Sequence, residues 1–185
     1  LEATQGQHAH GRLYAVDQPR GDRAPSARDL RLRVLLIAVG RPRAPGLAAA
    51  ISEYEQRAAR YWPFEAIEVR EEPARAGAPD LVREREGERL LKAVPAGAHL
   101  VACDPGGRSW DSLGFAGWLQ GERERASDVA FVVGGALGLS AAVLTAARTR
   151  LALAPWTLPH EMARLVLAEQ IYRAGTIGRG EPYNK

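Results

Sequence analysis

The sequence predicts an α/β domain with a mainly parallel sheet of about five strands and flanking helices. Two observations carry this prediction. Short runs rich in Val, Ile and Leu alternate along the chain with amphipathic, helix-like segments. The composition of the 185 residues, 46% hydrophobic and 25% charged, is ordinary for a globular protein and excludes wholesale disorder and disulfide-dense scaffolds.

The predicted domain begins at Leu32. Residues 1–31 mix Gly, Pro, His, Arg and Asp without an apolar period or the apolar stretch of a signal peptide, so we interpret them as a disordered extension or a start-site artefact. From Leu32 to Val39 the chain becomes an apolar run closed by Gly40, which is typical of a buried parallel strand. Residues 32–185 are therefore expected to form a single domain.

The other elements follow in alternation. A helix with one apolar face is expected over residues 47–61, and an alternating strand over residues 64–69 completes a βαβ unit. Residues 79–93 predict a surface helix, in which we interpret the charge run Arg83 to Arg89 as a solvated face. The later expected strands cover residues 99–103, 128–133 and 150–154, and the later expected helices cover residues 112–120, 140–147 and 161–174.

Charge and cysteine content narrow the class of protein. A formal net charge of +3 gives only weak support for a general polyanion-binding surface. Cys103 is the only cysteine, so an intramolecular disulfide is excluded and a cytoplasmic location is favoured. The His and Cys residues show no ligand spacing, so no metal site is predicted. The uncharged window from Val129 to Ala147 has the length of a membrane span, but its glycines and mixed periodicity argue against one.

The segment from Phe131 to Ser140 is a buried strand that runs into a glycine-rich turn and then a helix. Glycines let a backbone come close to a ligand, and sites in such sheets lie at the carboxyl ends of the strands. A tight turn that only needs positive φ would look the same. The glycine spacing matches neither the dinucleotide fingerprint nor the P-loop, which disfavours ordinary nucleotide binding and a flavodoxin-like binder.

The segment from Leu151 to His160 is a strand that ends in a loop with two prolines. Such a loop is stiff and offers backbone amides and carbonyls beside apolar side chains, as a binding pocket does. A structural linker would look similar, and His160 on its own is as well explained by a local hydrogen bond at a helix start.

The carboxyl end, Arg179 to Tyr183, combines a cation, a turn and a rigid aromatic. Together these groups can hold a phosphate and stack on a base. Fraying is the alternative, because chain ends of this polarity are commonly loose.

In combination, these features resemble one known family. The chain contains, in order, the motifs Val-Val-Gly-Gly-x-x-Gly-Leu-Ser, Leu-Ala-x-x-Thr-Leu-Pro-His, Arg-x-x-x-x-Glu-Gln-x-Tyr-Arg-Ala and Arg-Gly-Glu-Pro-Tyr. Their order and spacing resemble those of the bacterial 23S rRNA (pseudouridine-N3)-methyltransferase family of the SPOUT superfamily, over residues 32–185. The resemblance implies an enzyme that uses S-adenosyl-L-methionine to methylate N3 of a pseudouridine in 23S ribosomal RNA.

The resemblance also implies an architecture and an assembly. The carboxyl-terminal part is expected to form a deep trefoil knot, an exception to the rule that chains avoid knots. The expected partners are ribosomal RNA or the assembled ribosome and a second copy of the chain, without a membrane. In such a homodimer the tail of one subunit completes the site of the other.

The resemblance assigns roles to residues of the three motif regions. The expected cofactor-binding positions are Cys103, Gly134, Leu153, Ala154, Pro155, Trp156, Thr157 and Leu158. The expected substrate-side positions are His160, Glu169, Tyr172 and Arg179. Arg164, Arg173 and Tyr183 are the catalytic candidates, because donors near the base would stabilise the anion that forms when N3 loses its proton.

Four residues depart from the usual family pattern. Asn184 replaces a His, Cys103 an aliphatic residue, Leu137 an acidic or polar residue, and Gly175 a large one. Asn cannot take up a proton near neutral pH, so a tail His acting as base or cation is excluded. Two alternatives therefore stay open: a SPOUT methyltransferase with another RNA target, and an RNA-binding relative without catalysis.

Overall fold

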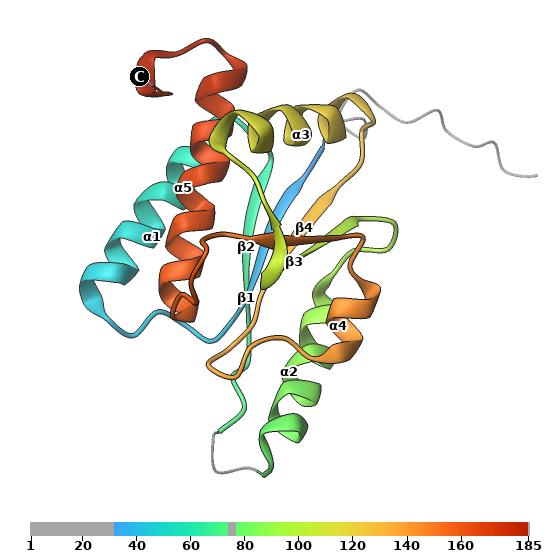
Figure 1. Cartoon of the computed structure of the whole chain (residues 1–185). Coiled ribbons are helices and arrows are strands. Elements are labelled where there is room, and N and C mark those ends of the chain that lie inside the picture. Colours follow the sequence, from blue (N-terminus) through green and yellow to red (C-terminus); the bar gives the residue numbers. More distant parts are fainter. Residues whose placement is uncertain (1–31, 74–76, 185) are drawn as a thin grey trace, which may run out of the picture.

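The computed structural model describes residues 32–73 and 77–184, so the expected extension, residues 1–31, lies outside the described residues. Its centre is a five-stranded sheet with the order β2-β1-β4-β3-β5, in which every neighbouring pair is parallel (Figure 1). The strands are β1 (Val34–Val39), β2 (Phe64–Val69), β3 (His99–Ser109), β4 (Val129–Val133) and β5 (Thr149–Ala152). The predicted α/β class with a parallel sheet is confirmed.

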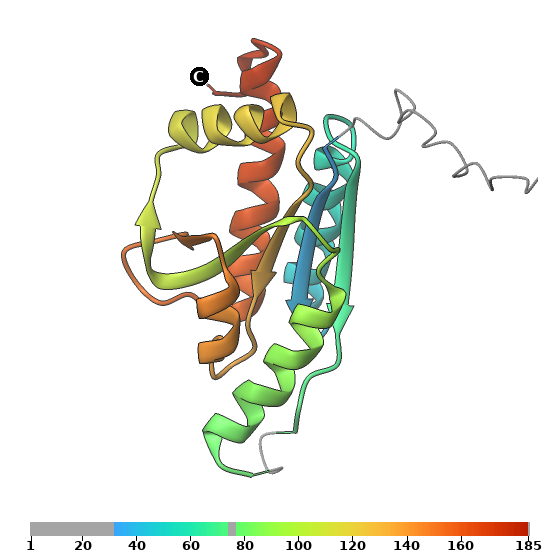
Figure 2. The ribbon, with the colours of Figure 1, turned by 90° about the vertical axis from the view of Figure 1, so that its right-hand side faces the viewer.

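Helices cover both faces of the sheet (Figures 1 and 2). They are α1 (Pro45–Ala58), α2 (Pro79–Ala93), α3 (Ser112–Glu124), α4 (Ala141–Ala146) and α5 (His160–Gly178), followed by the 3-10 helix η1 (Pro182–Asn184). One core layer joins α1, α3 and α5 to side chains such as Leu36 and Phe131, and the other joins α2 and α4 to Leu35 and Val132. Successive strand residues thus feed opposite layers, as the period of a β-strand requires.

The central strands are the most apolar part of the chain. Every residue of β1 and of β4 is buried, which agrees with the unbroken apolar runs that predicted them. Strand β2 lies at an edge of the sheet, and its side chains are largely exposed or half-buried. The alternating sequence of residues 64–69 reflects this edge position.

Two elements extend beyond their predicted ends for non-local reasons. Strand β3 continues past Cys103 through an irregularity to Ser109, because Gly107 packs on β5 so closely that a Cβ there would lie 2.5 Å from the carbonyl carbon of Arg150. Helix α5 continues past Ala174 to Gly178, and Thr176 in this last part is fully buried. Neither contact can be read from a local sequence pattern.

The strand order has a topological switch point between β1 and β4. From β1 it moves outward to β2, whereas β4, β3 and β5 all lie on the other side of β1. Ligands of open α/β sheets bind outside the carboxyl ends of strands near such a switch point. Gly134 follows β4 directly at this place, so the fold directs attention to the glycine-rich turn.

Gly175 shows how the helices close over one face. A Cβ at this position would lie 2.5 Å from both Cβ and Cγ of Tyr61, so the absence of a side chain lets the Tyr61 residue approach α5. Gly175 stands where the resembled family usually has a large residue. In this chain Tyr61 fills the space that such a side chain would occupy.

We predict that Gly175→Ala destabilises the protein, although Ala is the better helix former. The added methyl group overpacks the contact with Tyr61 and should lower the free energy of unfolding by about 1–3 kcal/mol in urea denaturation. Gly178→Ala is the matched control, because no described atom lies within 4 Å of a Cβ there. In a Tyr61→Gly background, which lacks both the Cβ and the ring, the penalty at Gly175 should disappear, and a penalty of equal size there would contradict this account of the contact.

Candidate functional site

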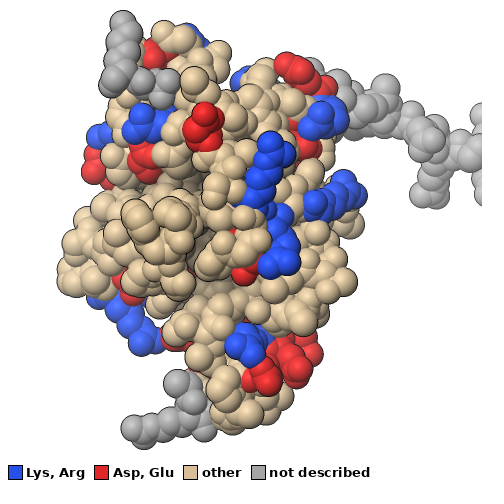
Figure 3. Space-filling view, in the orientation of Figure 1, with Lys and Arg blue, Asp and Glu red and all other residues tan. Residues whose placement is uncertain are grey.

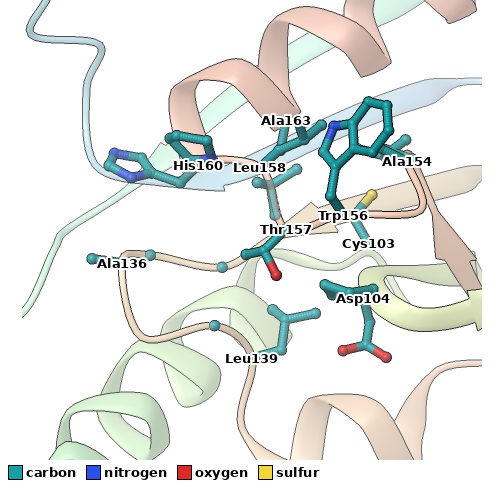
Figure 4. Close-up of a pocket in the computed structure, with 17 residues that line it drawn as sticks. Cys103, Asp104, Ala136, Leu139, Ala154, Trp156, Thr157, Leu158, His160 and Ala163 are labelled. Carbon is teal, nitrogen blue, oxygen red and sulfur yellow. The ribbon is translucent and has the colours of Figure 1, made fainter.

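A pocket of about 520 Å³ opens at the carboxyl ends of β4 and β5, beside the middle of β3 where its pairing with β4 ends (Figure 4). Three segments surround it: residues 103–105 within β3, residues 133–139 after β4, and residues 153–163 between β5 and the first turn of α5. Its size lies in the range of small-molecule sites. The glycine-rich turn and the proline-flanked loop, which the sequence singled out separately, therefore form one site.

The glycine turn is closed against itself. A Cβ on Gly134 would lie 2.7 Å from the carbonyl carbon of Gly138, and the Gly138 amide donates a hydrogen bond of 3.0 Å to the carbonyl oxygen of Gly135. Gly138 has a φ of +83°, a conformation that L side chains rarely adopt. The wall of the pocket at this point is backbone, and a side chain at position 134 would have to displace it.

The loop before α5 forms the opposite wall. Figure 4 shows the side chain of Thr157 pointing into the cavity between Ala136 and Asp104, while the imidazole of His160 points away from its centre. Trp156 lies at the rim, and 68% of its surface is exposed. The pocket thus combines apolar side chains with backbone groups and one hydroxyl.

Two titratable groups line the pocket from β3. Asp104 pairs with Arg150 of β5 at 2.5 Å and also accepts a hydrogen bond from the amide of Gly106. Burial raises the pKa of the Cys103 thiol to about 12, so Cys103 keeps its proton at physiological pH. The pocket therefore offers one carboxylate and one neutral thiol.

The expected cofactor positions largely converge. Of the described residues, those that line the pocket include every expected cofactor position except Pro155, which belongs to the same loop, and they also include His160, expected on the substrate side. The pocket has further lining residues that the sequence did not single out for this role: Asp104, Pro105, Val133, Gly135, Ala136, Gly138, Leu139, Pro159 and Ala163. Most of these residues are sequence neighbours of the motif residues, and this proximity could have predicted that they line the pocket.

Arg164 lies elsewhere in the fold. Its guanidinium is buried and pairs with Glu55 of α1 and Glu68 of β2, each at 2.8 Å. It is not among the residues that line the pocket. These ion pairs make Arg164 a cation that joins α5 to α1 and β2, and its expected catalytic role stays a prediction.

The remaining candidates gather at the far end of α5. Arg173 pairs with Glu169 at 2.6 Å, and its guanidinium lies 4.7 Å from the ring centroid of Tyr183. The Tyr183 hydroxyl donates to Glu169 at 3.1 Å, and the Tyr183 ring lies 4.7 Å from that of Tyr172. Burial, reinforced by Tyr54 and Glu169, raises the pKa of Tyr183, so its hydroxyl is a donor and not a base. We call Glu169, Tyr172, Arg173 and Tyr183 the tail cluster.

The tail cluster and the pocket are well separated within one chain. Ala163 lines the pocket, whereas Arg173 lies ten residues further along α5, which at about 1.5 Å per residue is a distance of about 15 Å. Figure 1 shows η1 near the last turns of α5 and far from the first turn of this helix. Arg179 also turns away from the pocket, since it stacks on Tyr61 at 4.5 Å and donates to the carbonyl oxygen of Arg60.

Glu86 of α2 is a buried residue that the sequence interpretation missed. It was included in a solvated charge run, but only 3% of its surface is exposed. It lies four residues after Val82 and four before Leu90, which are both buried. This helical spacing was the signal that could have placed Glu86 on the inner face.

Two features are absent from the described residues, 32–73 and 77–184. Within these ranges no helix is both long and apolar enough to cross a bilayer. The same residues contain no group of three or more His, Cys, Asp or Glu side chains arranged to hold a metal ion.

Comparisons with known proteins agree on one family. The family model described as predicted SPOUT methyltransferase matches residues 32–184. Ribosomal RNA large subunit methyltransferase H of Gemmatimonas aurantiaca is 63% identical over 154 residues, which cover 83% of this chain and 100% of that protein. The protein of the same name from Anaeromyxobacter sp. strain Fw109-5 is 47% identical over 156 residues, which cover 84% of this chain and 100% of that protein.

Likeness to solved structures is weaker. A probable methyltransferase from Bordetella pertussis Tohama I is 20% identical with a TM-score of 0.49, over 80% of this chain and 96% of that one. The SpoU methyltransferase AviRb from Streptomyces viridochromogenes, solved with AdoMet, is 18% identical with a TM-score of 0.39, over 82% of this chain and 62% of that one.

The thiol of Cys103 gives a direct test of the pocket's electrostatics. We expect iodoacetamide to alkylate native protein near pH 8 at least about 100-fold more slowly than protein unfolded in urea, because thiolate is the reactive form. Mass spectrometry of quenched samples measures both rates. The native rate should still rise between about pH 7 and pH 9, as it does below a high pKa. Equal native and unfolded rates would contradict the raised pKa of this half-buried thiol.

Proposed function

This chain belongs to the SPOUT methyltransferase family, and on that premise we propose that it uses S-adenosyl-L-methionine to methylate N3 of a pseudouridine in 23S ribosomal RNA. The observation that carries the proposal is the pocket at the carboxyl ends of β4 and β5, beside the middle of β3, which joins the glycine turn to the loop before α5. Support for the RNA target comes from full-length relatives named as large subunit rRNA methyltransferases. A target on the ribosome implies a cytoplasmic location.

The residues present fit such a cofactor. The wall at Gly134 is backbone that a Cβ would displace by colliding with Gly138, and the walls at Leu153 and Leu158 are apolar, as an adenine ring requires. The groups that would hold the cofactor are the backbone of residues 134–138 and 153–158, with Thr157 and Asp104 as polar side chains. When bound, S-adenosyl-L-methionine supplies an activated methyl group on a sulfonium, so the task left to the protein is to position two reactants.

The chain's own residues contribute position and protection. Cys103 holds its proton on Sγ, so the thiol does not compete with the RNA base as a nucleophile. The ion pair with Arg150 holds the Asp104 carboxylate beside the pocket. Thr157 presents a hydroxyl between the two walls (Figure 4). These groups orient the cofactor and do not themselves act on the base.

A second subunit would bring a tail cluster close to the pocket, because the two lie far apart within one chain. Because about 15 Å of α5 separates the pocket from the tail cluster, we propose a homodimer in which the tail of one subunit, with Arg179 and Tyr183, faces the pocket of the other. Arg173 and Arg179 then provide cations near the base, where they would stabilise the anion at N3. Tyr183, held as a donor by Glu169, can stack or donate but cannot accept the proton.

Exposed arginines beside the pocket provide a surface for RNA phosphates. Arg108 of β3 and Arg148 and Arg150 at β5 are all exposed, and Arg150 is linked to the pocket through Asp104. Figure 3 shows basic side chains gathered over this part of the molecule. Arginine clusters of this kind bind phosphates without reading sequence. The local surface suits a polyanion better than the net charge of +3 suggests.

The family knot is also part of this proposal. The three segments that surround the pocket lie within β3, at the end of β4 and after β5, and the last of them carries the chain from the edge strand β5 to α5 on the α1 face of the sheet. This arrangement supports a crossing of the carboxyl-terminal part through its own loops.

The proposed activity is tested by expressing the chain in a bacterial strain that lacks its own enzyme of this family and mapping modified bases in 23S RNA by mass spectrometry. We expect methylation at N3 of pseudouridine to return. Methylation of a different RNA would favour the alternative of a SPOUT methyltransferase with another RNA target. The exposed Leu137 on the glycine turn is the residue that supports this alternative. If the folded protein is abundant and the ribosomes stay unmethylated, the result would favour the other alternative, an RNA-binding relative without catalysis.

Gly134→Val tests the cofactor site separately from the reaction. The valine side chain collides with the backbone at Gly138, so we expect calorimetry to show affinity for S-adenosyl-L-methionine reduced at least about 100-fold, with folding retained. Gly117→Ala is the control, because a Cβ there meets no described atom within 4 Å. Unchanged affinity in Gly134→Val would remove the glycine turn from the site.

The shared site is tested by subunit mixing. Deleting residues 180–185 should preserve folding and cofactor affinity but abolish methyl transfer, because the pocket is built without them. Mixing this variant with Gly134→Val should restore activity, since a heterodimer then contains one intact pocket facing one intact tail. If heterodimers form and stay inactive, each chain uses its own tail and the shared site is wrong.

A further inference from the structure

Glu86 is a buried carboxyl group without an obvious structural task. It lies on the inner face of α2, between the turns that carry Val82 and Leu90. Its Oε1 accepts a hydrogen bond of 3.0 Å from the amide of Glu72. Its Oε2 is buried and finds no hydrogen-bond partner among the described residues, which is uncommon in folded proteins. Such a group calls for an explanation in terms of what it touches.

The unpaired oxygen lies against the glycine turn. A Cβ on Gly135 would be 2.7 Å from Oε2 of Glu86, so only a glycine leaves room for the carboxyl group. The next residue of α2, Gly87, makes a second close approach: a Cβ there would overlap Oγ of Ser140, the N-cap of α4. Helix α2 thus contacts the segment 134–140 near its start and at its end, through two adjacent residues.

This contact comes from behind the pocket. Gly135 lines the pocket, whereas Glu86 and Gly87 are not among its lining residues. Helix α2 packs beside α4 on the face of the sheet opposite to α5, as Figure 2 shows. Glu86 therefore contacts the glycine turn at Gly135 on the side that faces away from the pocket.

The charge state of Glu86 matters at this place. Burial raises the pKa of Glu86, and the nearby carboxylates of Glu71 and Glu72 act in the same direction. The amide of Glu72 and the guanidinium of Arg89 oppose the increase. A neutral carboxyl group can remain against Gly135 at low cost, whereas an ionised one needs a donor or water at Oε2.

We propose that Glu86 is a positioning residue for the cofactor pocket: its carboxyl group fixes the shape of the turn at residues 134–138, and it does so in the neutral state. The inference rests on the proposed function, because it concerns the same pocket. Ionisation of Glu86 draws water or a backbone amide toward Oε2 and shifts Gly135. Cofactor affinity is therefore constant below the pKa of Glu86 and falls as the pH rises through it.

The experiment measures the affinity for S-adenosylhomocysteine, the stable product, by calorimetry between about pH 5 and pH 9. In the unchanged protein the affinity should fall at least about tenfold across this range. Glu86→Gln keeps an oxygen that can accept from the Glu72 amide and has no charge to gain, so its affinity should stay within about threefold of the unchanged protein at low pH, without the fall. Glu86→Leu should bind at least about tenfold more weakly at every pH.

The controls separate Glu86 from other groups. Any pH dependence that Glu86→Gln retains belongs to groups other than Glu86, which are present in all variants. Glu84→Gln removes an exposed carboxyl group of α2 and should keep the full profile of the unchanged protein. If Glu86→Gln shows the same fall in affinity as the unchanged protein, the proposal is overturned, whether or not Glu86→Leu folds.

Hydrogen exchange in the absence of ligand makes the test independent of cofactor binding. Amides of residues 135–139 should exchange at least about tenfold faster in Glu86→Leu than in Glu86→Gln, if the carboxyl group orders the turn. Equal exchange in the two variants would contradict the proposal. Should no variant bind S-adenosylhomocysteine, the proposed function fails while the exchange rates still decide the role of Glu86.

Discussion

The contact of two backbone segments, at Gly134 and Gly138, is the constraint on which the functional half of the molecule depends. The turn can close only because a Cβ at Gly134 would lie 2.7 Å from the Gly138 carbonyl carbon and none is present. This closure ends β4, leads into α4 at Ser140 and leaves a backbone wall on the pocket. It also brings Gly135 against Glu86. The pocket, the start of α4 and the approach of α2 are thus consequences of one turn.

Helix α5 is the second organising element, because its two ends have different tasks. Its first turn lines the pocket, its second turn is anchored by Arg164 between Glu55 and Glu68, and its second half carries the tail cluster together with η1. A buried arginine with two carboxylate partners holds the helix firmly, and removing one partner of such a group is costly. The helix therefore acts as a rigid spacer of 19 residues. A rigid spacer keeps pocket and tail apart within a chain and makes a shared site between two chains the natural arrangement.

Local patterns predicted the parts of the fold that depend on local physics. The apolar runs of β1 and β4, the alternation of β2 and the full extent of α2 were all readable, as was the meeting of two motif loops at one edge of the sheet. The surroundings of Arg164 and Glu86 depend on contacts between segments that are distant in sequence. Arg164 looked like a free cation because its partners, Glu55 and Glu68, lie about 100 residues away in sequence. Glu86 was hidden in a run of exposed charges, although its spacing from Val82 and Leu90 marks the inner face.

The central claim is that the glycine turn and the loop before α5 together hold S-adenosyl-L-methionine. A crystal structure of the protein grown with S-adenosylhomocysteine tests it most directly. The account predicts the ligand between residues 134–138 and 153–158, in contact with backbone groups of both segments and close to Cys103. A ligand bound elsewhere, or one that contacts only one of the two segments, would contradict it.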